Sequence, residues 1–591
     1  MVNAFFKKSS LMNRVFISIL LALALAGCGD DSSSSSSTNT TDTTDTTDTT
    51  DTTDTTDTTD TTDTTDTTDT TESSSSTVTI SGTIEYERVP FSANFVGLDY
   101  DNIEELPVRG VVVYALSSDG NVLDETDISE TGTYSLEVDQ NTDVKVYFEV
   151  KTVSTGTAAW DFEIRDNTND NSLYALSGSL TSSGEEDSTR NLLATSGWDG
   201  STYTGNRLSA PLAILDTIYD AVQLVVATDP NVQMDDADIF WSVNNTNASG
   251  ENSDGDIGSS HYSNDELYIL GDADNDTDEF DEHVIAHEWG HYLEDNLSRA
   301  DSIGGSHSTG NLLDMRVALG EGFGNAFSGM VTNDSIYLDS LGTAQANSFG
   351  FDVEENDNTN PGWYSEGSVQ SILYDIYDSV DDDADIVSLG FPAIYEAMTS
   401  DDYINQSSQT SIFSLITAIK SFNSASETKI DDLVTAQAST TETFLGIDTI
   451  SDNYGSTETH VGIANDDLDI SPYKEILDDG VDVEVCSSTD SQSYNGLGVR
   501  QLLRLNVASA GEHIITATYS RGDITTEASD PDFFVYLNGD FQNNATSDLA
   551  STDTTTMTLA EDEYILEVYD FGNIDGSVNA IVCFNLTVTA T

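Results

Sequence analysis

The chain has 591 residues, and because 106 of them are Asp or Glu and only 18 are Lys or Arg, its formal net charge is −88 at pH 7. Such an excess of negative charge repels phosphate backbones and argues against nucleic acid as a partner. Hydrophobic residues still make up 37% of the chain, which is enough to bury cores, and the length predicts about three domains.

The N-terminus has the pattern of an export signal. Three basic residues precede an apolar run, residues 15–26, that ends in L-A-G-C at Cys28. This run is too short to span a bilayer comfortably. Small residues before a cysteine resemble the lipobox of bacterial lipoproteins, which implies that residues 1–27 are a signal peptide and that Cys28 is acylated. The acyl chains would anchor the protein in a membrane, and Gly29 implies the outer membrane of the cell envelope. A plain secretory signal is the alternative.

Residues 28–77 consist of a serine run followed by T-D-T triplets, with an aspartate at every third position from Asp42 to Asp69. Almost no apolar side chain is present to offset the entropy of ordering the backbone. This composition predicts a disordered, extended and charged tether that holds the folded part away from the membrane.

Residues 78–153 predict a small β-sandwich. Stretches such as V-T-I-S-G-T-I-E-Y and V-K-V-Y-F-E-V alternate β-branched or aromatic residues with polar ones, between Gly and Asp turns. The order of these stretches resembles the carboxypeptidase-regulatory-like family of sandwiches. Residues 154–204 are less distinct, and we expect either further strands or a connecting or accessory segment.

Helical periodicity begins at S-A-P-L-A-I-L-D-T-I-Y, where apolar residues recur at three and four and Pro211 occupies the first turn. Helices and loops then predict a mixed domain over residues 205–480. Strand patterns return over 481–591, as in H-I-I-T-A-T-Y and Y-I-L-E-V-Y-D, and resemble the prepeptidase C-terminal family of β-sandwiches.

The two cysteines beyond Cys28 are Cys486 and Cys583, both in the last quarter of the chain. In an exported protein a disulfide between them is the natural pairing. Two unpaired thiols remain the alternative, because a sequence does not supply the Cα distance that a bridge requires.

The stretch H-E-W-G-H, residues 287–291, has the spacing of a metal site. On a helix, His287 and His291 present their imidazoles on one side, where a single zinc ion can bridge them, and Glu288 lies beside the metal. Gly290 costs helix stability and indicates that another backbone packs closely there. Two structural histidines on an ordinary helix are the alternative.

A catalytic zinc needs a third protein ligand and an open position for water. Six residues after His291 stands Leu297 rather than histidine, which excludes the metzincin pattern. Glu321, in A-L-G-E-G-F-G-N-A-F, is flanked by apolar residues at helical spacing, and a zinc ion would compensate its buried charge. The alternatives are a solvent-exposed Glu321 near a helix start, and His307 as the ligand.

The combination D-E-F-D-E-H-V-I-A-H-E-W-G-H, I-G-G and G-E-G-F-G-N-A-F-S-G-M-V resembles the fungalysin family of thermolysin-like zinc metallopeptidases. The resemblance implies that His287, His291 and Glu321 bind Zn²⁺ and that Glu288 is the catalytic carboxylate. It also implies a multidomain architecture in which an α+β thermolysin-like zincin domain lies between all-β sandwich domains. The usual large propeptide is not evident, so residues 78–204 are either an accessory domain or a shortened inhibitor.

Three positions beyond the ligands bear on activity. Tyr364 stands where the family has a histidine, and its phenol could donate to an oxyanion or serve only in packing. Asn325 replaces a family aspartate and could still orient a zinc-bound histidine without adding charge. The segment Glu266–Leu270 resembles thermolysin's edge strand, which implies pairing with an extended substrate. An ordinary interior strand is the alternative.

A possible calcium site lies just before the metal-binding helix. Acidic residues alternate in G-D-A-D-N-D-T-D, namely Asp272, Asp274, Asp276 and Asp278. Oxygen ligands for Ca²⁺ often recur in this way, but the EF-hand pattern fails at Thr277 and His283. A solvated acidic loop is the alternative.

These observations predict a zinc metalloendopeptidase that hydrolyses extracellular protein or peptide substrates from a lipid anchor. Glu288 would act as the base beside the zinc. A non-catalytic surface-binding or adhesion protein is the alternative that Asn325 and Tyr364 favour, and a zinc hydrolase acting on a non-peptide bond is a third.

Overall fold

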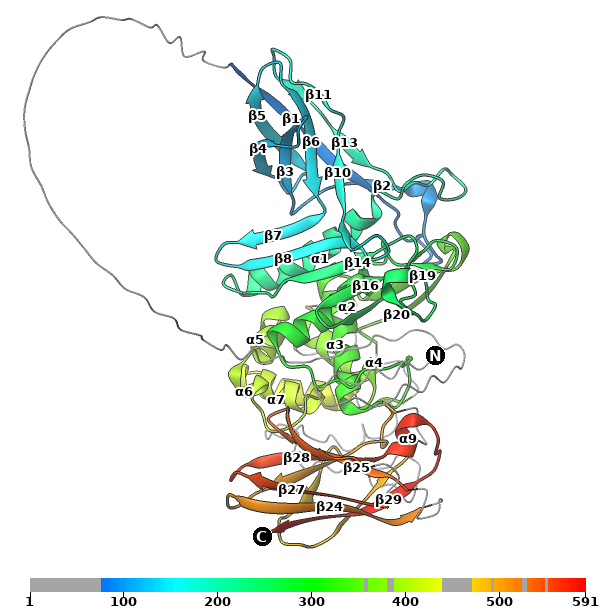
Figure 1. The fold of residues 1–591 in the computed structure, drawn as a ribbon, viewed down its shortest axis with the longest axis vertical. Helices are drawn as coiled ribbons and strands as arrows, with labels where there is room; N and C mark the ends of the chain where they lie inside the picture. Colours follow the sequence, from blue (N-terminus) through cyan, green and yellow to red (C-terminus); the bar gives the residue numbers. More distant parts are fainter. Residues whose placement is uncertain are drawn as a thin grey trace, which may run out of the picture.

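The computed structural model describes residues 76–355, 360–379, 387–437, 470–489, 494–522, 529–547 and 551–591. The predicted signal peptide, the predicted lipidation site Cys28 and the tether up to residue 75 lie outside the described residues. Along the long axis of Figure 1, an N-terminal β-sandwich, a central unit of sheets and helices, and a C-terminal β-sandwich follow one another. The predicted multidomain architecture of sheets and helices is confirmed.

The N-terminal β-sandwich consists of two sheets built around β1 and β6. In β5, Tyr134, Leu136 and Val138 are buried while the residues between them are exposed, as the sequence alternation predicts. The first sheet contains β1 (Thr77–Arg88), β2 (Glu104–Pro107), β5 (Thr133–Asp139), β12 (Ser188–Thr189) and β13 (Leu192–Ala194). The second contains β3 (Val112–Ser117), β4 (Val122–Asp127), β6 (Asp143–Glu149), β10 (Ala175–Ser177) and β11 (Thr181–Ser182).

Residues 154–204 are not a simple connection, because their strands are divided between two units. Strands β10 to β13 return to the sandwich, whereas β7 (Lys151–Thr155), β8 (Ala159–Asp166) and β9 (Ser172–Leu173) join the central sheet. Phe162 of β8 packs edge-on against Trp289 and Tyr292, in the helix that contains His287 and His291. One continuous hydrophobic core therefore runs from the sandwich into the central unit.

The central sheet has the order β15-β16-β14-β8-β7, with β14 (Ala237–Trp241), β15 (His261–Ser263) and β16 (Glu266–Ile269). The expectation that the 266–270 segment forms a sheet edge is wrong: β16 pairs with β14 on one side and with β15 on the other. The short β15 is the edge strand instead. An apolar pattern predicts that a strand is buried, but it does not predict which strands pair with it. The edge strand was therefore predicted wrongly.

Most helices of the central unit lie between its sheet and the C-terminal sandwich in Figure 1. They are α2 (Glu282–Leu297), α3 (Met315–Thr332), α4 (Glu366–Tyr377), α5 (Phe391–Met398), α6 (Asp401–Ile404), α7 (Ile412–Phe422) and α8 (Glu427–Gln437). The remaining helix, α1 (Ala210–Thr228), is long and apolar enough to cross a membrane by length and composition. It is mostly buried in the shared core, with Pro211 in its first turn as predicted.

A second, small sheet has the order β17-β18-β19-β20 and lies beside the start of α2. Its strands are β17 (Gly271–Asp272), β18 (Asp276–Thr277), β19 (Ile336–Leu341) and β20 (Asn347–Asp352). The pairing of Asp276 with Leu341 joins the acidic loop before α2 to the hairpin after α3.

The C-terminal sandwich has its own hydrophobic core. One sheet contains β21 (Lys474–Ile476), β23 (Gln501–Asn506), β25 (Pro531–Leu537), β26 (Asp540–Ala545) and β28 (Glu563–Asp570). The other contains β22 (Val483–Ser487), β24 (Gly511–Gly522), β27 (Thr552–Leu559) and β29 (Val582–Ala590), and the short helix α9 (Phe571–Asp575) follows β28. The disulfide between Cys486 and Cys583, predicted as the natural pairing, is present and joins β22 to β29.

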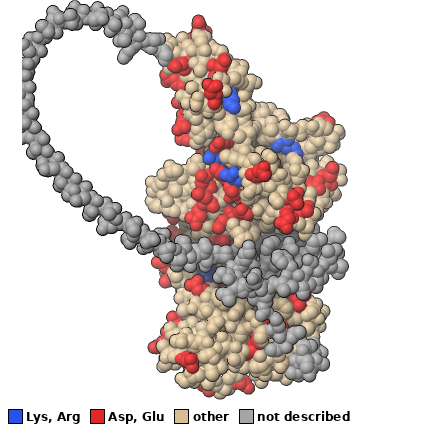
Figure 2. Space-filling view, viewed as in Figure 1, with Lys and Arg blue, Asp and Glu red and all other residues tan. Residues whose placement is uncertain are grey.

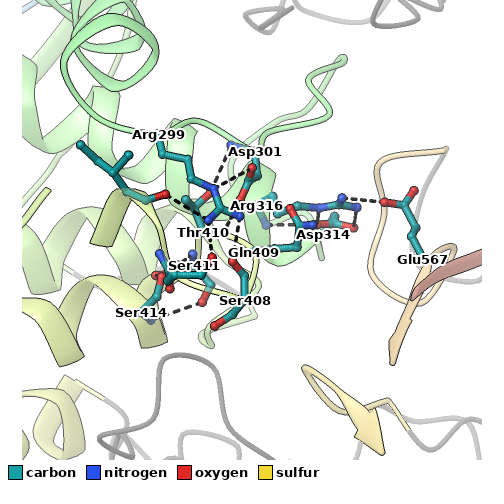
Figure 3. A network of polar contacts seen from close by, with 12 residues as sticks. Arg299, Asp301, Asp314, Arg316, Ser408, Gln409, Thr410, Ser411, Ser414 and Glu567 are labelled. Atoms are coloured by element: carbon teal, nitrogen blue, oxygen red, sulfur yellow. Dashed lines mark hydrogen bonds and ion pairs between the residues drawn. The ribbon is translucent and has the colours of Figure 1, made fainter. Parts of the chain in front are cut away.

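A buried polar network fastens the C-terminal sandwich to the start of α3 (Figure 3). Arg316 pairs with both oxygens of Asp314, each at 2.9 Å, and its Nη1 donates to Glu567 of β28 at 2.7 Å. Arg500 donates to the other oxygen of Glu567 at 2.8 Å. Because these side chains are almost fully buried, the charges stay paired, and the helix that contains Glu321 is held by the sandwich.

We expect Glu567→Gln to lower the free energy of unfolding by about 1–2 kcal/mol, because a neutral amide accepts more weakly from two buried guanidinium groups. Urea unfolding monitored by tryptophan fluorescence measures the change. Glu484→Gln is the control, because its exposed pair with Arg521 should contribute less than about 0.5 kcal/mol. Equal effects of the two substitutions would show that the network does not stabilise the junction.

Candidate active site

Two neighbouring helices bring the predicted metal ligands together. His287 and His291 lie on α2 and Glu321 lies on α3, and all three side chains are buried. The Nε2 atoms of the two histidines are 3.1 Å apart, and Oε2 of Glu321 is 3.3 Å from the Nε2 of His287 and 3.6 Å from that of His291. Glu321 is therefore buried as predicted, and the alternative of a solvent-exposed Glu321 is wrong.

These three distances fit a zinc ion. Ligand atoms at bond lengths of about 2.0–2.2 Å in a tetrahedron are separated by about 3.3–3.6 Å. The described residues provide no hydrogen bond to the buried Oε2 of Glu321. Burial opposes the ionisation of Glu321, but His307 and the two ligand histidines outweigh it and hold the pKa of this carboxyl well below its usual range. The cluster is therefore a set of donors suited to a cation.

Outer contacts orient both histidines. The Nδ1 of His287 lies 2.8 Å from Oδ1 of Asn325, and the amide of Asn325 donates to Gln370 at 3.0 Å, which fixes which atom faces the imidazole. His287 thus donates through Nδ1 and leaves the lone pair of Nε2 for a metal. On the other side, Nδ1 of His291 lies 3.5 Å from the buried carboxylate of Glu294. Sequence reasoning missed Glu294, although its i+3 spacing from His291 was a usable signal.

Close packing of α2 on α3 keeps this arrangement in place. A Cβ atom on Gly290 would lie 3.3 Å from the Cα of Gly324, so the predicted close approach of another backbone is confirmed. A Cβ atom on Gly324 would lie 2.9–3.0 Å from three atoms of the His287 ring. Gly324 therefore provides the space that the imidazole occupies.

We expect Gly324→Ala to weaken zinc binding by about 10-fold to 100-fold, because the methyl group must displace the His287 ring from Asn325. Alanine has a higher helix propensity than glycine, so a weaker affinity for zinc would not result from unfolding of α3. Competition with a chromogenic chelator measures the affinity. Gly320→Ala is the matched control, since its Cβ atom meets its neighbours at 3.5 Å or more. An unchanged affinity in Gly324→Ala would contradict this account of the packing.

Glu288 faces the edge strand of the central sheet. Its Oε2 accepts a hydrogen bond of 2.9 Å from the backbone N–H of Tyr262 in β15. Sequence reasoning had assigned the strand beside the cleft to residues 266–270. The structure instead places β15 beside the carboxylate of Glu288. The predicted ligands His287 and His291 lie one residue before and three residues after Glu288 in the same helix.

His307 lies between two carboxylates of the site. Its Nε2 is 3.3 Å from Oε2 of Glu321 and 3.3 Å from Oε2 of Glu366, the first residue of α4. Burial lowers the pKa of His307, but Glu321 and Glu366 outweigh it, so the net shift is upward. Among the described residues, the group whose ligand atoms all lie within 4.8 Å of one another at this site comprises His287, His291 and Glu321. His307 adjoins that group without completing it.

Tyr364 lies in the turn before α4. Its hydroxyl donates to the carbonyl of Pro361 at 3.4 Å, and its ring packs edge-on against Trp363. The ring also lies over Gly362, where a Cβ atom would come within 2.5 Å of it. The hydroxyl thus points into its own loop, and the imidazole beside Glu321 belongs to His307.

Comparison with known proteins bears on the same stretch of chain. Residues 235–420 match the family model described as "Mycolysin C-terminal domain". No curated protein matches the chain.

Two solved structures show weak similarity to it. The pre-peptidase C-terminal domain of a collagenase from Bacillus anthracis is 12% identical, with 20% of this chain and 94% of that chain covered at a TM-score of 0.15. The periplasmic lysozyme inhibitor PliG from Aeromonas hydrophila is 11% identical, with 20% and 97% covered at a TM-score of 0.14. Scores this low have no bearing on the fold or the function.

The matched family is mycolysin, whereas the sequence motifs resemble fungalysin. His287, His291 and Glu321, together with Glu288 and His307, fall inside the matched stretch. Residues 235–420 are thus similar to the C-terminal domain of mycolysin, which points to a peptidase.

Proposed function

We propose that this protein is a zinc metalloendopeptidase that hydrolyses extracellular proteins while anchored to the cell envelope by a lipid on Cys28. The observation that carries the proposal is the buried triangle of His287, His291 and Glu321, with edges of 3.1, 3.3 and 3.6 Å and Glu288 beside it. Three protein ligands leave a fourth position for water, which distinguishes catalytic zinc sites from structural ones.

The chemistry divides between the metal and the surrounding side chains. His287, His291 and Glu321 would hold a zinc ion, which would supply Lewis acidity for the scissile carbonyl and for a water molecule. Glu288 takes a proton from that water as the water oxygen forms a bond to the carbonyl carbon. When the C–N bond breaks, Glu288 delivers this proton to the leaving amine. The products are then one carboxylic acid and one amine, and Glu288 is again ionised.

His307 is suited to stabilise the negative charge that develops on the carbonyl oxygen. Its Nε2 lies 3.3 Å from a carboxylate oxygen of Glu321, and an imidazole N–H is a donor suited to an oxyanion. Glu366 contacts the same Nε2 atom at 3.3 Å. Asn325 orients His287 without adding a charge.

The experiment that tests the proposal combines metal analysis with a digest of a peptide library by the purified protein. We expect one zinc per chain and cleavage at internal peptide bonds. Zinc without cleavage of any peptide would contradict the proposal.

A non-catalytic surface-binding protein is the second candidate, and one observation favours it. Glu288 is only 2% exposed and already accepts a hydrogen bond from Tyr262, so its carboxylate must exchange this partner for water in order to act. The same library digest separates the candidates, because a binding protein would retain peptides without cutting them.

A further inference from the structure

A second cluster of carboxylates lies where β18, β19 and the start of α2 meet. Asp276 is in β18, Asp278 follows it, Asp339 is in β19, and Asp281 is the N-cap residue of α2. Only two of the four aspartates in the predicted calcium loop take part, and the third ligand position comes from Asp339, about sixty residues further along the chain. This group therefore joins two segments of the chain rather than a single loop.

Among the described residues, none forms a hydrogen bond with one buried oxygen of each of these aspartates. The unpartnered atoms are the Oδ1 atoms of Asp276, Asp278, Asp281 and Asp339. The second oxygens of two of them are held in place: Asp278 accepts from the hydroxyl of Ser260, and Asp281 accepts from the backbone N–H of Ser340 at 2.7 Å and from its hydroxyl at 2.9 Å. Asp278 is 3% exposed and Asp281 is fully buried. Buried carboxylate oxygens without partners are costly unless a cation compensates them.

No basic side chain supplies that compensation. Within the described part of the chain, no Lys, Arg or His forms an ion pair with any of the four aspartates. The neighbouring Arg207 is committed to Glu279, Thr277 and the carbonyl of Gly271. Asp281 does not cap α2 with its side chain, which is instead turned towards Ser340. The charges that act most strongly on Asp276, Asp278 and Asp281 are negative, and they include that of Asp272.

The spacing fits one calcium ion. One oxygen from each of Asp276, Asp278 and Asp339 lies within 4.8 Å of the other two. Oxygen ligands on opposite sides of Ca²⁺, at bonds of about 2.3–2.6 Å, are about 4.6–5.2 Å apart. Mg²⁺ requires shorter, octahedral bonds and retains several waters, which suits a buried site with this many carboxylates less well.

We propose that Asp276, Asp278 and Asp339 bind one Ca²⁺ ion, with the buried charge of Asp281 beside it. The ion would tie β18 and β19 to the segment that leads into α2, in which Asp278 lies nine residues before His287. Its role is structural: it fixes the helix that presents the histidines and Glu288. The proposal is independent of whether the zinc site is catalytic.

The electrostatics of the calcium-free protein support this site. Burial, followed by the charge of Asp276, raises the pKa of Asp339 to about 8, and burial raises the pKa of Asp276 to about 6. Above pH about 4 these two carboxyl groups have lost their protons in the unfolded chain but still hold them in the native state. Its free energy of unfolding therefore falls as the pH rises from about 4 to about 8. Bound Ca²⁺ should remove most of this dependence.

The test uses the full chain with Glu288→Gln, so that self-digestion does not interfere. Metals are removed with EGTA, one equivalent of zinc is restored to every sample, and the melting temperature is measured at pH 8 with and without Ca²⁺. We expect Ca²⁺ to raise Tm by at least about 5 °C, and equilibrium dialysis with ⁴⁵Ca to give one ion per chain. No bound calcium, or an equal Tm shift with Mg²⁺, would overturn the proposal.

Two substitutions locate the ion. Asp339→Asn should abolish the calcium-dependent shift, and its calcium-free Tm should not fall below that of the parent, because a repelling charge has been removed. Asp274→Asn is the matched control: this aspartate is exposed in the same loop and should leave the shift intact. If Asp339→Asn keeps the shift, or if Asp274→Asn loses it, the ligands are not those proposed here.

Discussion

Replacing Glu288 by Gln should lower the rate of casein cleavage by at least about 10³-fold and leave zinc bound at one ion per chain. A glutamine has nearly the same shape and can still accept from the N–H of Tyr262, but it cannot take a proton from water. His287, His291 and Glu321 are unchanged, so the affinity for zinc should be unchanged. The measurements are the initial rate of casein digestion and zinc content by atomic emission.

Glu282→Gln in the same helix is the control. Its carboxylate pairs with Arg88 at 2.7 Å, one turn before the metal ligands, and the substitution should leave both zinc and rate close to wild type. If Glu288→Gln digests casein as fast as the wild type, Glu288 is not the base.

The second large effect is expected at His307. His307→Ala should lower kcat by about 10²–10³-fold while zinc affinity and KM stay nearly unchanged, because the imidazole would act on the oxyanion of the transition state. A glutamine at this position can still donate a hydrogen bond, so His307→Gln should recover part of the lost rate. Steady-state kinetics on a short peptide, together with zinc titration, measure all three quantities.

A loss of zinc in His307→Ala would change the role assigned to His307. If His307→Ala loses zinc in proportion to its loss of rate, His307 is a fourth protein ligand, and the position for water is closed. The site would then have the four-ligand pattern of structural zinc, which favours the binding-protein alternative. Glu366→Gln should also lower kcat, since Glu366 holds the His307 ring at 3.3 Å.

The sequence predicted what depends on local spacing. The i and i+4 positions of His287 and His291 determine one side of α2, and the apolar residues around Glu321 determine that it is buried on α3. Gly290 indicated the close approach of another backbone, which proved to be that of Gly324. The alternation in β5 and the cysteine pair were predictable for the same reason, because each follows from periodicity or from export.

Contacts between distant segments were not predictable in this way. Nothing local distinguishes β16 as an interior strand from β15 as the edge, because pairing depends on the whole sheet. The division of residues 154–204 between two sheets has the same origin. Asp339 joins the aspartates before α2 only because β18 pairs with β19, and the loop with His307 reaches Glu366 only through the packing of α3 on α4.

The most direct test of the central claim is the rate of casein cleavage as zinc is removed and then restored to the purified protein. We predict that the rate falls to background when zinc is removed with 1,10-phenanthroline. It should return in proportion to added zinc, with a plateau at one ion per chain. A rate that is independent of zinc, or a fully zinc-loaded protein that cleaves no casein, would contradict the assignment of His287, His291, Glu321 and Glu288 to a peptidase site.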